Sequence, residues 1–214
     1  MNGRQKSISR CYINTIFIAV LTFAPLFWQR CSTLYCQDTQ FKGLSDWTSK
    51  LNDKEKLSLA VSYFQSGKYH EALLLFKKLD SKYKLNPRFQ AYMGVSYFYD
   101  GEYEKAIAML ENILKKLQVF SPHEQSVYYY CTAESYFRLK KYIDAVPLYE
   151  HHLLLCYNNE KGDSLYRIGI CYKQLGDIET AQEYFIEAMA YYRKFNDKDK
   201  LERIGHEIEK QNEQ

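Results

Sequence analysis

Adjacent histidines His151 and His152 are the residues of this sequence best suited by type to bind a metal ion or move a proton. Neighbouring residues on a helix point about 100° apart, so both cannot ligate one ion from the same face. His70-Glu71 lacks the second histidine of a zinc-protease helix. The sequence has no glycine-rich phosphate loop and no serine or cysteine in a nucleophile signature. It therefore predicts no catalytic residue, no cofactor and no metal site, and we expect a protein that is not an enzyme.

Cysteine is the other residue type that could do chemistry. Cys131, Cys156 and Cys171 follow the first 36 residues, and all three fall in apolar helical patterns without a C-x-x-C pair. We predict buried, inert thiols. In an oxidising compartment the alternative is one disulfide with one thiol left over.

Composition narrows the function classes. The 214 residues are 46% hydrophobic and 26% charged, which is typical of a globular protein. Only 9 Gly and 4 Pro, beside 21 Tyr and 12 Phe, favour long helices over many short strands. The first 36 residues hold four basic residues and no acid, which leaves 25 basic and 26 acidic residues in the remainder. This nearly neutral body lacks the basic surface that nucleic-acid binding requires.

The N-terminal 36 residues resemble a targeting segment. Basic residues precede Tyr12–Trp28, an uncharged stretch of 17 residues with a dense apolar run, which is the pattern of a secretory signal. We predict a signal peptide over 1–36 that is cleaved before Gln37, or a retained anchor, since 17 residues lie at the short limit for spanning a bilayer. Either reading places the rest of the chain outside the cytoplasm. The absence of N-x-S/T sequons favours the bacterial periplasm.

Beyond this segment the chain repeats one pattern four times. A small residue is followed at fixed spacing by Tyr, by an aromatic residue or Ile, by Ala, and by a large residue, and successive patterns are offset by 34, 39 and 36 residues. Constant spacing within a unit and variable spacing between units indicate that insertions lie between units. The four occurrences are Ala60-Tyr63-Tyr69-Ala72-Phe76, Gly94-Tyr97-Tyr103-Ala106-Leu110, Ala133-Tyr136-Tyr142-Ala145-Tyr149 and Gly169-Tyr172-Ile178-Ala181-Phe185.

This pattern resembles the tetratricopeptide repeat (TPR), although the tryptophan of that family is replaced by Lys56, Gln90, Tyr129 and Leu165. The resemblance implies an all-α fold, a right-handed superhelical solenoid of four helix-turn-helix repeats with a C-terminal capping helix. We expect a linker over 37–51 and a TPR domain over 52–211. Its predicted repeats are about 54–87, 88–121, 126–159 and 162–195, and its predicted capping helix is about 199–211.

The packing and the helix caps expected at the repeated positions agree with the resemblance. Small residues permit two antiparallel helices of one unit to approach closely, and we expect the large residue that ends each pattern to fill the space between neighbouring units. Asn52, Asn86 and Ser121 are predicted N-caps, because Asn or Ser stands before a Glu three residues later or before a Pro at the first helical position.

The resemblance also implies where a partner would bind. First helices of TPR units line a concave groove, which here would be aromatic and apolar with basic residues toward one end, suited to an amphipathic helix or an extended peptide. Val61 and Val95 stand where a carboxylate clamp needs Asn, so binding of a free C-terminus is disfavoured. The predicted groove residues are Leu57, Val61, Phe64, Val95, Phe98, Tyr99, Tyr130, Glu134, Phe137, Arg138, Tyr166, Ile170 and Lys173.

Together these features predict a non-enzymatic protein–protein interaction scaffold in the cell envelope. The alternative is a membrane-tethered structural subunit of a larger envelope complex, which would touch the membrane only through an uncleaved N-terminal segment. The two differ in whether the groove or the outer surfaces of the repeats carry the contacts.

Overall fold

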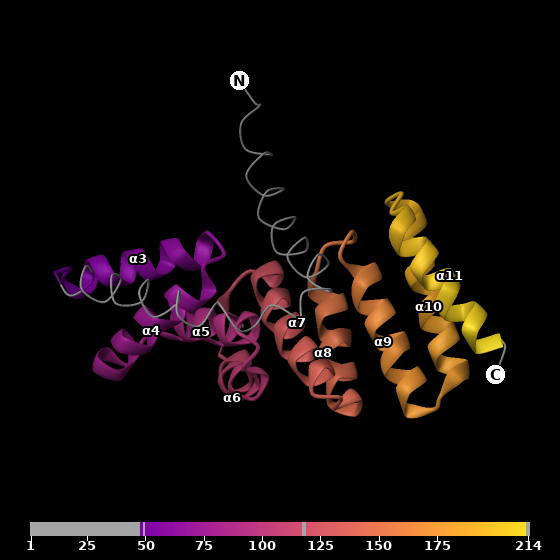
Figure 1. The fold of residues 1–214 in the computed structure, drawn as a ribbon, viewed down its shortest axis with the longest axis horizontal. Coiled ribbons are helices and arrows are strands. Elements are labelled where there is room, and N and C mark those ends of the chain that lie inside the picture. The colour runs from indigo at the N-terminus through magenta and orange to yellow at the C-terminus, as the bar shows by residue number, and fades with distance from the viewer. Residues whose placement is uncertain (1–47, 49, 117–118, 213–214) are drawn as a thin grey trace, which may run out of the picture. The chain divides into compact units, whose positions relative to one another are not determined.

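The computed structural model describes residues 48, 50–116 and 119–212, and in these residues it contains α-helices and no strand. The predicted leader, 1–36, lies outside the described residues, and only three residues of the predicted linker 37–51 are described. Figure 1 shows the helices in chain order. They are α3 (Asp53–Gln65), α4 (Tyr69–Tyr83), α5 (Pro87–Tyr99), α6 (Tyr103–Leu114), α7 (Pro122–Arg138), α8 (Tyr142–Leu155), α9 (Lys161–Leu175), α10 (Ile178–Lys194) and α11 (Lys198–Asn212).

These helices form an all-α repeat fold, as the sequence predicts. The chain divides into two compact units, the first ending at Leu75 and the second beginning at Phe76, both within α4. In the second unit each helix packs on the next from α5 to α11 (Figure 1). None of the described helices is both long enough and apolar enough to span a membrane.

Side-chain caps begin the first helices where the sequence predicts them. The Asn52 side chain accepts from the Glu55 N–H while the Glu55 carboxylate accepts from the Asn52 N–H, which completes a capping box before α3. Asn86 caps α5 and Ser121 caps α7, each with proline at the first helical position. Local polar chemistry therefore fixes where these helices start.

Tight turns join the two helices of each pair. Three of the four turns place a glycine in the left-handed region, for example Gly101 with φ of 78°, and the third turn places Lys140 there with φ of 59°. A side chain at positive φ is strained, whereas glycine is not. The α7–α8 turn is thus the one of the four built from an unfavourable residue.

The small residue that begins each repeated pattern and the large residue that ends it contact each other within one repeat. A Cβ added to Gly94 would lie 2.6 Å from Leu110, and one added to Gly169 would lie 2.6 Å from the Phe185 ring. The large residue, which we expected to fill the space between neighbouring repeats, therefore also packs within its own repeat. Tyr149 does both, because it packs with Ala133 of its own pair and with Ile168 of the next. Tyr149 thus joins its own helix pair to the next one.

The last helix covers the end of the fold. Ile204 of α11 is fully buried in a cluster with Leu165, Phe185 and Tyr192, and Leu201 and Ile208 pack against that cluster. These three α11 residues lie on one face at helical spacing, as predicted for a capping helix. The apolar faces of α9 and α10 are consequently not left open.

Candidate partner-binding face

Residues of the first unit that were predicted to line a groove lie on α3. Leu57, Val61 and Phe64 are each half-buried, and the Phe64 ring packs edge-on against Tyr69 with ring centres 5.6 Å apart. Each of the three retains exposed surface. Their part in binding a partner stays a prediction.

In the second unit the predicted residues separate into two groups by burial. Four are buried, with Glu134 fully so, and they cannot contact a partner unless the helices rearrange: Val95, Phe98, Glu134 and Tyr166. Six keep exposed surface: Tyr99, Tyr130, Phe137, Arg138, Ile170 and Lys173. We call the surface of these six, on α5, α7 and α9, the first-helix face.

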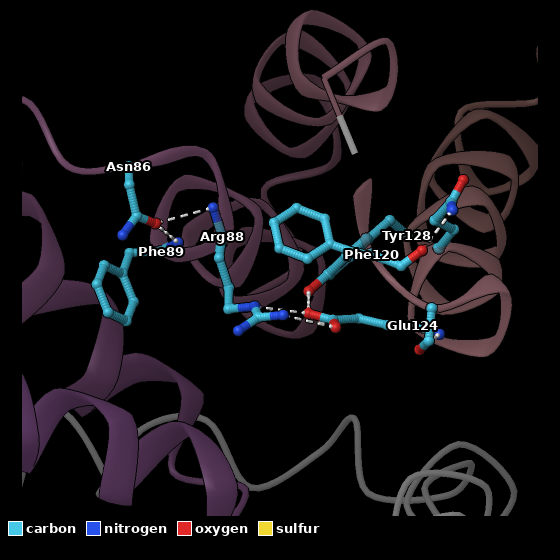
Figure 2. A network of polar contacts seen from close by, with 8 residues as sticks. Asn86, Arg88, Phe89, Phe120, Glu124 and Tyr128 are labelled. Carbon is cyan, nitrogen blue, oxygen red and sulfur yellow. Dashed lines mark hydrogen bonds and ion pairs between the residues drawn. The ribbon is translucent and has the colours of Figure 1, made fainter. Parts of the chain in front are cut away.

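The starts of α5 and α7 are joined by a charged contact (Figure 2). Arg88 Nε and Nη2 donate to the two Glu124 oxygens at 3.0 and 3.1 Å, and the guanidinium lies 4.4 Å from the Phe120 ring centre. Tyr128 donates its hydroxyl to Glu124 at 3.0 Å. A two-bond pair with a planar guanidinium fixes orientation better than a single charge contact does. This pair links the starts of the two first helices.

A buried carboxylate joins α7 to α9. Glu134 Oε1 lies 2.7 Å from Arg167 Nη2, and Glu134 Oε2 accepts from the Tyr149 hydroxyl at 3.0 Å. The Arg167–Oε1 contact is an ion pair without the alignment of a hydrogen bond. Burial first, and then the charge of Glu134, raise the pKa of Tyr149, so its hydroxyl keeps the proton it donates. Arg167 also lies over the Phe137 ring, 4.6 Å from its centre.

Two further contacts join α9 to α11. Arg203 lies over the Tyr166 ring, 4.5 Å from its centre, and Lys173 donates to Glu207 at 2.8 Å. Lys173 is therefore neutralised by a capping-helix carboxylate. Of the predicted basic residues, Arg138 is the one whose charge extends into solvent, since 41% of its side chain is exposed and it lies 3.9 Å from Glu134.

Sequence reasoning missed the arginines of this face. Arg167 stands one turn before Ile170 on α9, so the same helical spacing that selected Ile170 would have selected it. Arg203 and Glu207 lie on the capping helix, whereas the predicted groove consists of first helices alone. The result is a face of aromatic and aliphatic side chains in which Lys173 is paired with Glu207 and Arg138 carries the exposed charge.

The histidine pair of the sequence does not act together. His151 is exposed, stacks on Tyr129, and has its Nδ1 2.9 Å from the Pro147 carbonyl, whereas His152 is buried. Cys131, Cys156 and Cys171 are free thiols and all three are buried, which confirms the predicted burial.

Comparison with known families bears on this arrangement. A family model described as tetratricopeptide repeat matches residues 124–194, and a second of the same description matches residues 92–116. The chain is a TPR protein. The matched stretches cover α7 to α10 and most of α5 and α6. They fall on the repeats that carry the first-helix face.

Solved structures with the same fold agree with this assignment. A MamA structure is 18% identical, with 67% of this chain and 80% of that chain covered and a TM-score of 0.57. MamA 41-end from Desulfovibrio magneticus RS-1 is 16% identical, with 88% and 97% covered and a TM-score of 0.56. TPR-like repeats of a candidate kinesin light chain from Podosopora anserina are 19% identical, with 66% and 75% covered and a TM-score of 0.51. At these identities the likeness establishes the fold alone. A comparison with curated proteins gave no match.

Proposed function

We propose that this TPR protein is a protein–protein interaction scaffold that binds an apolar helix or an extended peptide on its first-helix face. TPR proteins are in general scaffolds rather than enzymes, which supports the broad class. The observation that carries the finer proposal is the partial exposure of Tyr99, Tyr130, Phe137 and Ile170 on successive first helices. Aromatic side chains give large contact area at small entropic cost, and such residues dominate binding energy at protein interfaces.

Paired charges in and beneath the face favour an apolar partner. Glu134 is held by Arg167, and Lys173 by Glu207, so binding there would leave these pairs intact. Arg138 supplies an exposed positive charge at the end of α7, which favours a partner with an acidic residue beside its apolar side chains. The expected ligand is thus an amphipathic segment with bulky apolar residues and at least one carboxylate.

Affinity capture with matched variants tests this proposal. Tyr99→Glu and Arg138→Glu should each lower capture of the partner at least about tenfold, because one puts a charge among apolar contacts and the other reverses the exposed charge. Ile186→Glu is the control, since Ile186 lies on second helix α10 with 64% of its surface exposed. Circular dichroism must show equal helical content in all three. Equal capture by all three would sink the proposal.

A structural role is the second candidate. Large apolar side chains are exposed on the second helices α8 and α10, where Ile143 is 73% exposed, Leu154 81% and Ile186 64%. Exposed apolar groups of this size favour contact with another protein. If the chain builds a complex through these helices, Leu154→Glu and Ile186→Glu should release it from that complex while Tyr99→Glu should not.

We also propose that the repeats lie outside the cytoplasm, in the bacterial periplasm, because of the basic and apolar pattern of residues 1–36. Mass spectrometry of the mature N-terminus tests the two forms of this proposal. A first peptide that starts at Gln37 supports cleavage, whereas an intact leader in the membrane fraction supports an anchor. An intact leader in the cytoplasmic fraction would contradict both.

A further inference from the structure

Three side chains with metal-binding atoms meet at the junction of the third and fourth repeats. His152 is in the last turn of α8, Cys156 ends that helix, and Glu160 immediately precedes α9. A ring nitrogen, the thiol sulfur and a carboxylate oxygen of these residues all lie within 4.8 Å of one another, and all three side chains are buried. The spacing of four residues between His152 and Cys156 puts both on one helix face.

A fourth donor comes from the start of α7. His123 Nε2 lies 3.2 Å from Glu160 Oε1, and 26% of its side chain is exposed. The junction therefore brings together two imidazoles, one thiol and one carboxylate from three successive segments of the fold. His123 forms the side of the cluster that faces solvent.

Other groups hold these side chains in place. Ser164 Oγ lies 2.8 Å from His152 Nδ1, and the Tyr157 N–H donates to Glu160 Oε2 at 3.1 Å. The Tyr157 ring stacks on His123 with ring centres 4.0 Å apart. Metal sites in proteins characteristically show such outer contacts, which fix the orientation of each ligand.

The repeat pattern shows that packing at the position of His152 does not require a histidine. It stands three residues after the large residue Tyr149, and the same position in the other repeats is held by Leu79, Ile113 and Ala188, all buried. Burying an imidazole where the fold accepts an aliphatic side chain is unfavourable unless a polar role compensates.

We propose that His152, Cys156, Glu160 and His123 form a zinc-binding site that joins the third and fourth repeats. Two nitrogens, one sulfur and one oxygen fill a tetrahedral zinc sphere, and a thiolate ligand disfavours Mg²⁺ and Ca²⁺. Three atoms no more than 4.8 Å apart lie within about 2.8 Å of a common point. Zinc bonds are ~2.0–2.3 Å long, so shifts on the order of 0.5–0.8 Å would bring these three atoms within bonding distance. His123, which contacts Glu160 Oε1, would turn toward the same point as the fourth ligand. The Cys156 thiol gives its proton to solvent as the sulfur–zinc bond forms.

Cobalt substitution of the full-length, reduced and chelator-treated protein tests this site directly. One equivalent of Co²⁺ should give a near-ultraviolet thiolate-to-cobalt band and the strong visible bands of tetrahedral cobalt, and Zn²⁺ should displace both. Cys156→Ser should abolish the near-ultraviolet band, while Cys171→Ser, a buried thiol outside the cluster, should leave it intact. Absence of the band in the wild type, or its persistence in Cys156→Ser, would overturn the proposal.

A variant that keeps the fold provides the second measurement. His152→Leu places at this position the residue found in the first repeat, so the variant should fold, yet zinc affinity should fall at least ~100-fold. Zn²⁺ should raise the thermal midpoint of the wild type and leave that of His152→Leu unchanged. Ser164→Ala should weaken zinc binding ~10–100-fold while the cobalt bands remain. An equal zinc-dependent rise in wild type and His152→Leu would show that the metal binds elsewhere.

Discussion

Glu134 shows most clearly how single residues organise this protein. The carboxylate is fully buried, and its stability depends on Arg167 from the next first helix and on the Tyr149 hydroxyl from its own pair. Removing one partner of a buried charge is far more destabilising than removing an exposed ion pair, because the charge remains without compensation. Glu134 therefore ties α7, α8 and α9 together at one point.

Tyr149→Phe tests this dependence. The change removes the hydroxyl but keeps the ring, so we expect a loss of about 2 kcal/mol of unfolding free energy from a hydrogen bond to a buried charged acceptor. Tyr172→Phe is the control, since Tyr172 stacks on Tyr184 and its hydroxyl has no hydrogen bond in the structure. Its effect should stay within about 0.5 kcal/mol. Urea unfolding of both variants decides, and equal effects would show that the Tyr149–Glu134 bond adds nothing.

For single residues, the sequence predicts the burial of the cysteines better than the contacts between charged side chains. Burial of the three cysteines follows from their apolar helical positions, and it was confirmed. The pairing of Glu134 with Arg167 was missed because the two residues are 33 positions apart and belong to different repeats. Such a pair becomes visible only when the rotation of one repeat against the next is known.

Elements of the fold depend on close approach between the two helices of a repeat. Gly169 has no room for a Cβ, because the Phe185 ring would lie 2.6 Å and the Ala181 carbonyl oxygen 3.2 Å away. Gly205 on α11 has nothing within 4 Å. The two glycines thus separate the effect of packing from that of helix propensity.

Alanine at each position tests the packing argument. Gly205→Ala should raise stability by up to ~1 kcal/mol through helix propensity alone. Gly169→Ala gains the same propensity but overpacks the helix pair by ~1–3 kcal/mol, so we expect a net loss. Thermal unfolding measures both. If Gly169→Ala were more stable than the wild type, glycine at this position would not be required for the close approach of α9 and α10.

Lys140→Gly tests the turn between α7 and α8. The other three turns have glycine at the left-handed position, so replacing Lys140 should stabilise the protein by ~0.5–1 kcal/mol. Lys141, with φ of −88°, is the neighbouring control, and Lys141→Gly should give no gain. A lower thermal midpoint for Lys140→Gly would show that its side chain contributes more than its backbone strain removes.

Helices, caps and turns follow from local sequence, which explains why they were predictable. Asn52, Asn86 and Ser121 each directly precede a helical pattern and cap the helix that follows, which depends little on the rest of the chain. The predicted groove residues depend instead on how deeply each helix sinks between its neighbours. Phe98 and Tyr166 were selected by spacing but are buried, since their helices are covered more fully than a generic repeat implies.

For the whole molecule, we propose that the first-helix face binds the partner and that the rest of the fold positions this face. First helices α5, α7 and α9 carry partly exposed aromatic and aliphatic side chains, and ion pairs link α5 to α7 at the surface and α7 to α9 in the interior. The zinc site would add a rigid link at the junction of the third and fourth repeats. Both features position surfaces for recognition, which suits a protein whose repeats bind other proteins.

In-cell photo-crosslinking tests the central claim most directly. A photoreactive residue is placed at Tyr99 and at Ile170 on the first-helix face, and at Leu154 and Ile186 on exposed second-helix surface. The captured proteins are identified by mass spectrometry. We predict that Tyr99 and Ile170 capture the same protein and that Leu154 and Ile186 do not. Capture of one protein from Leu154 and Ile186, with none from Tyr99 or Ile170, would contradict the proposal.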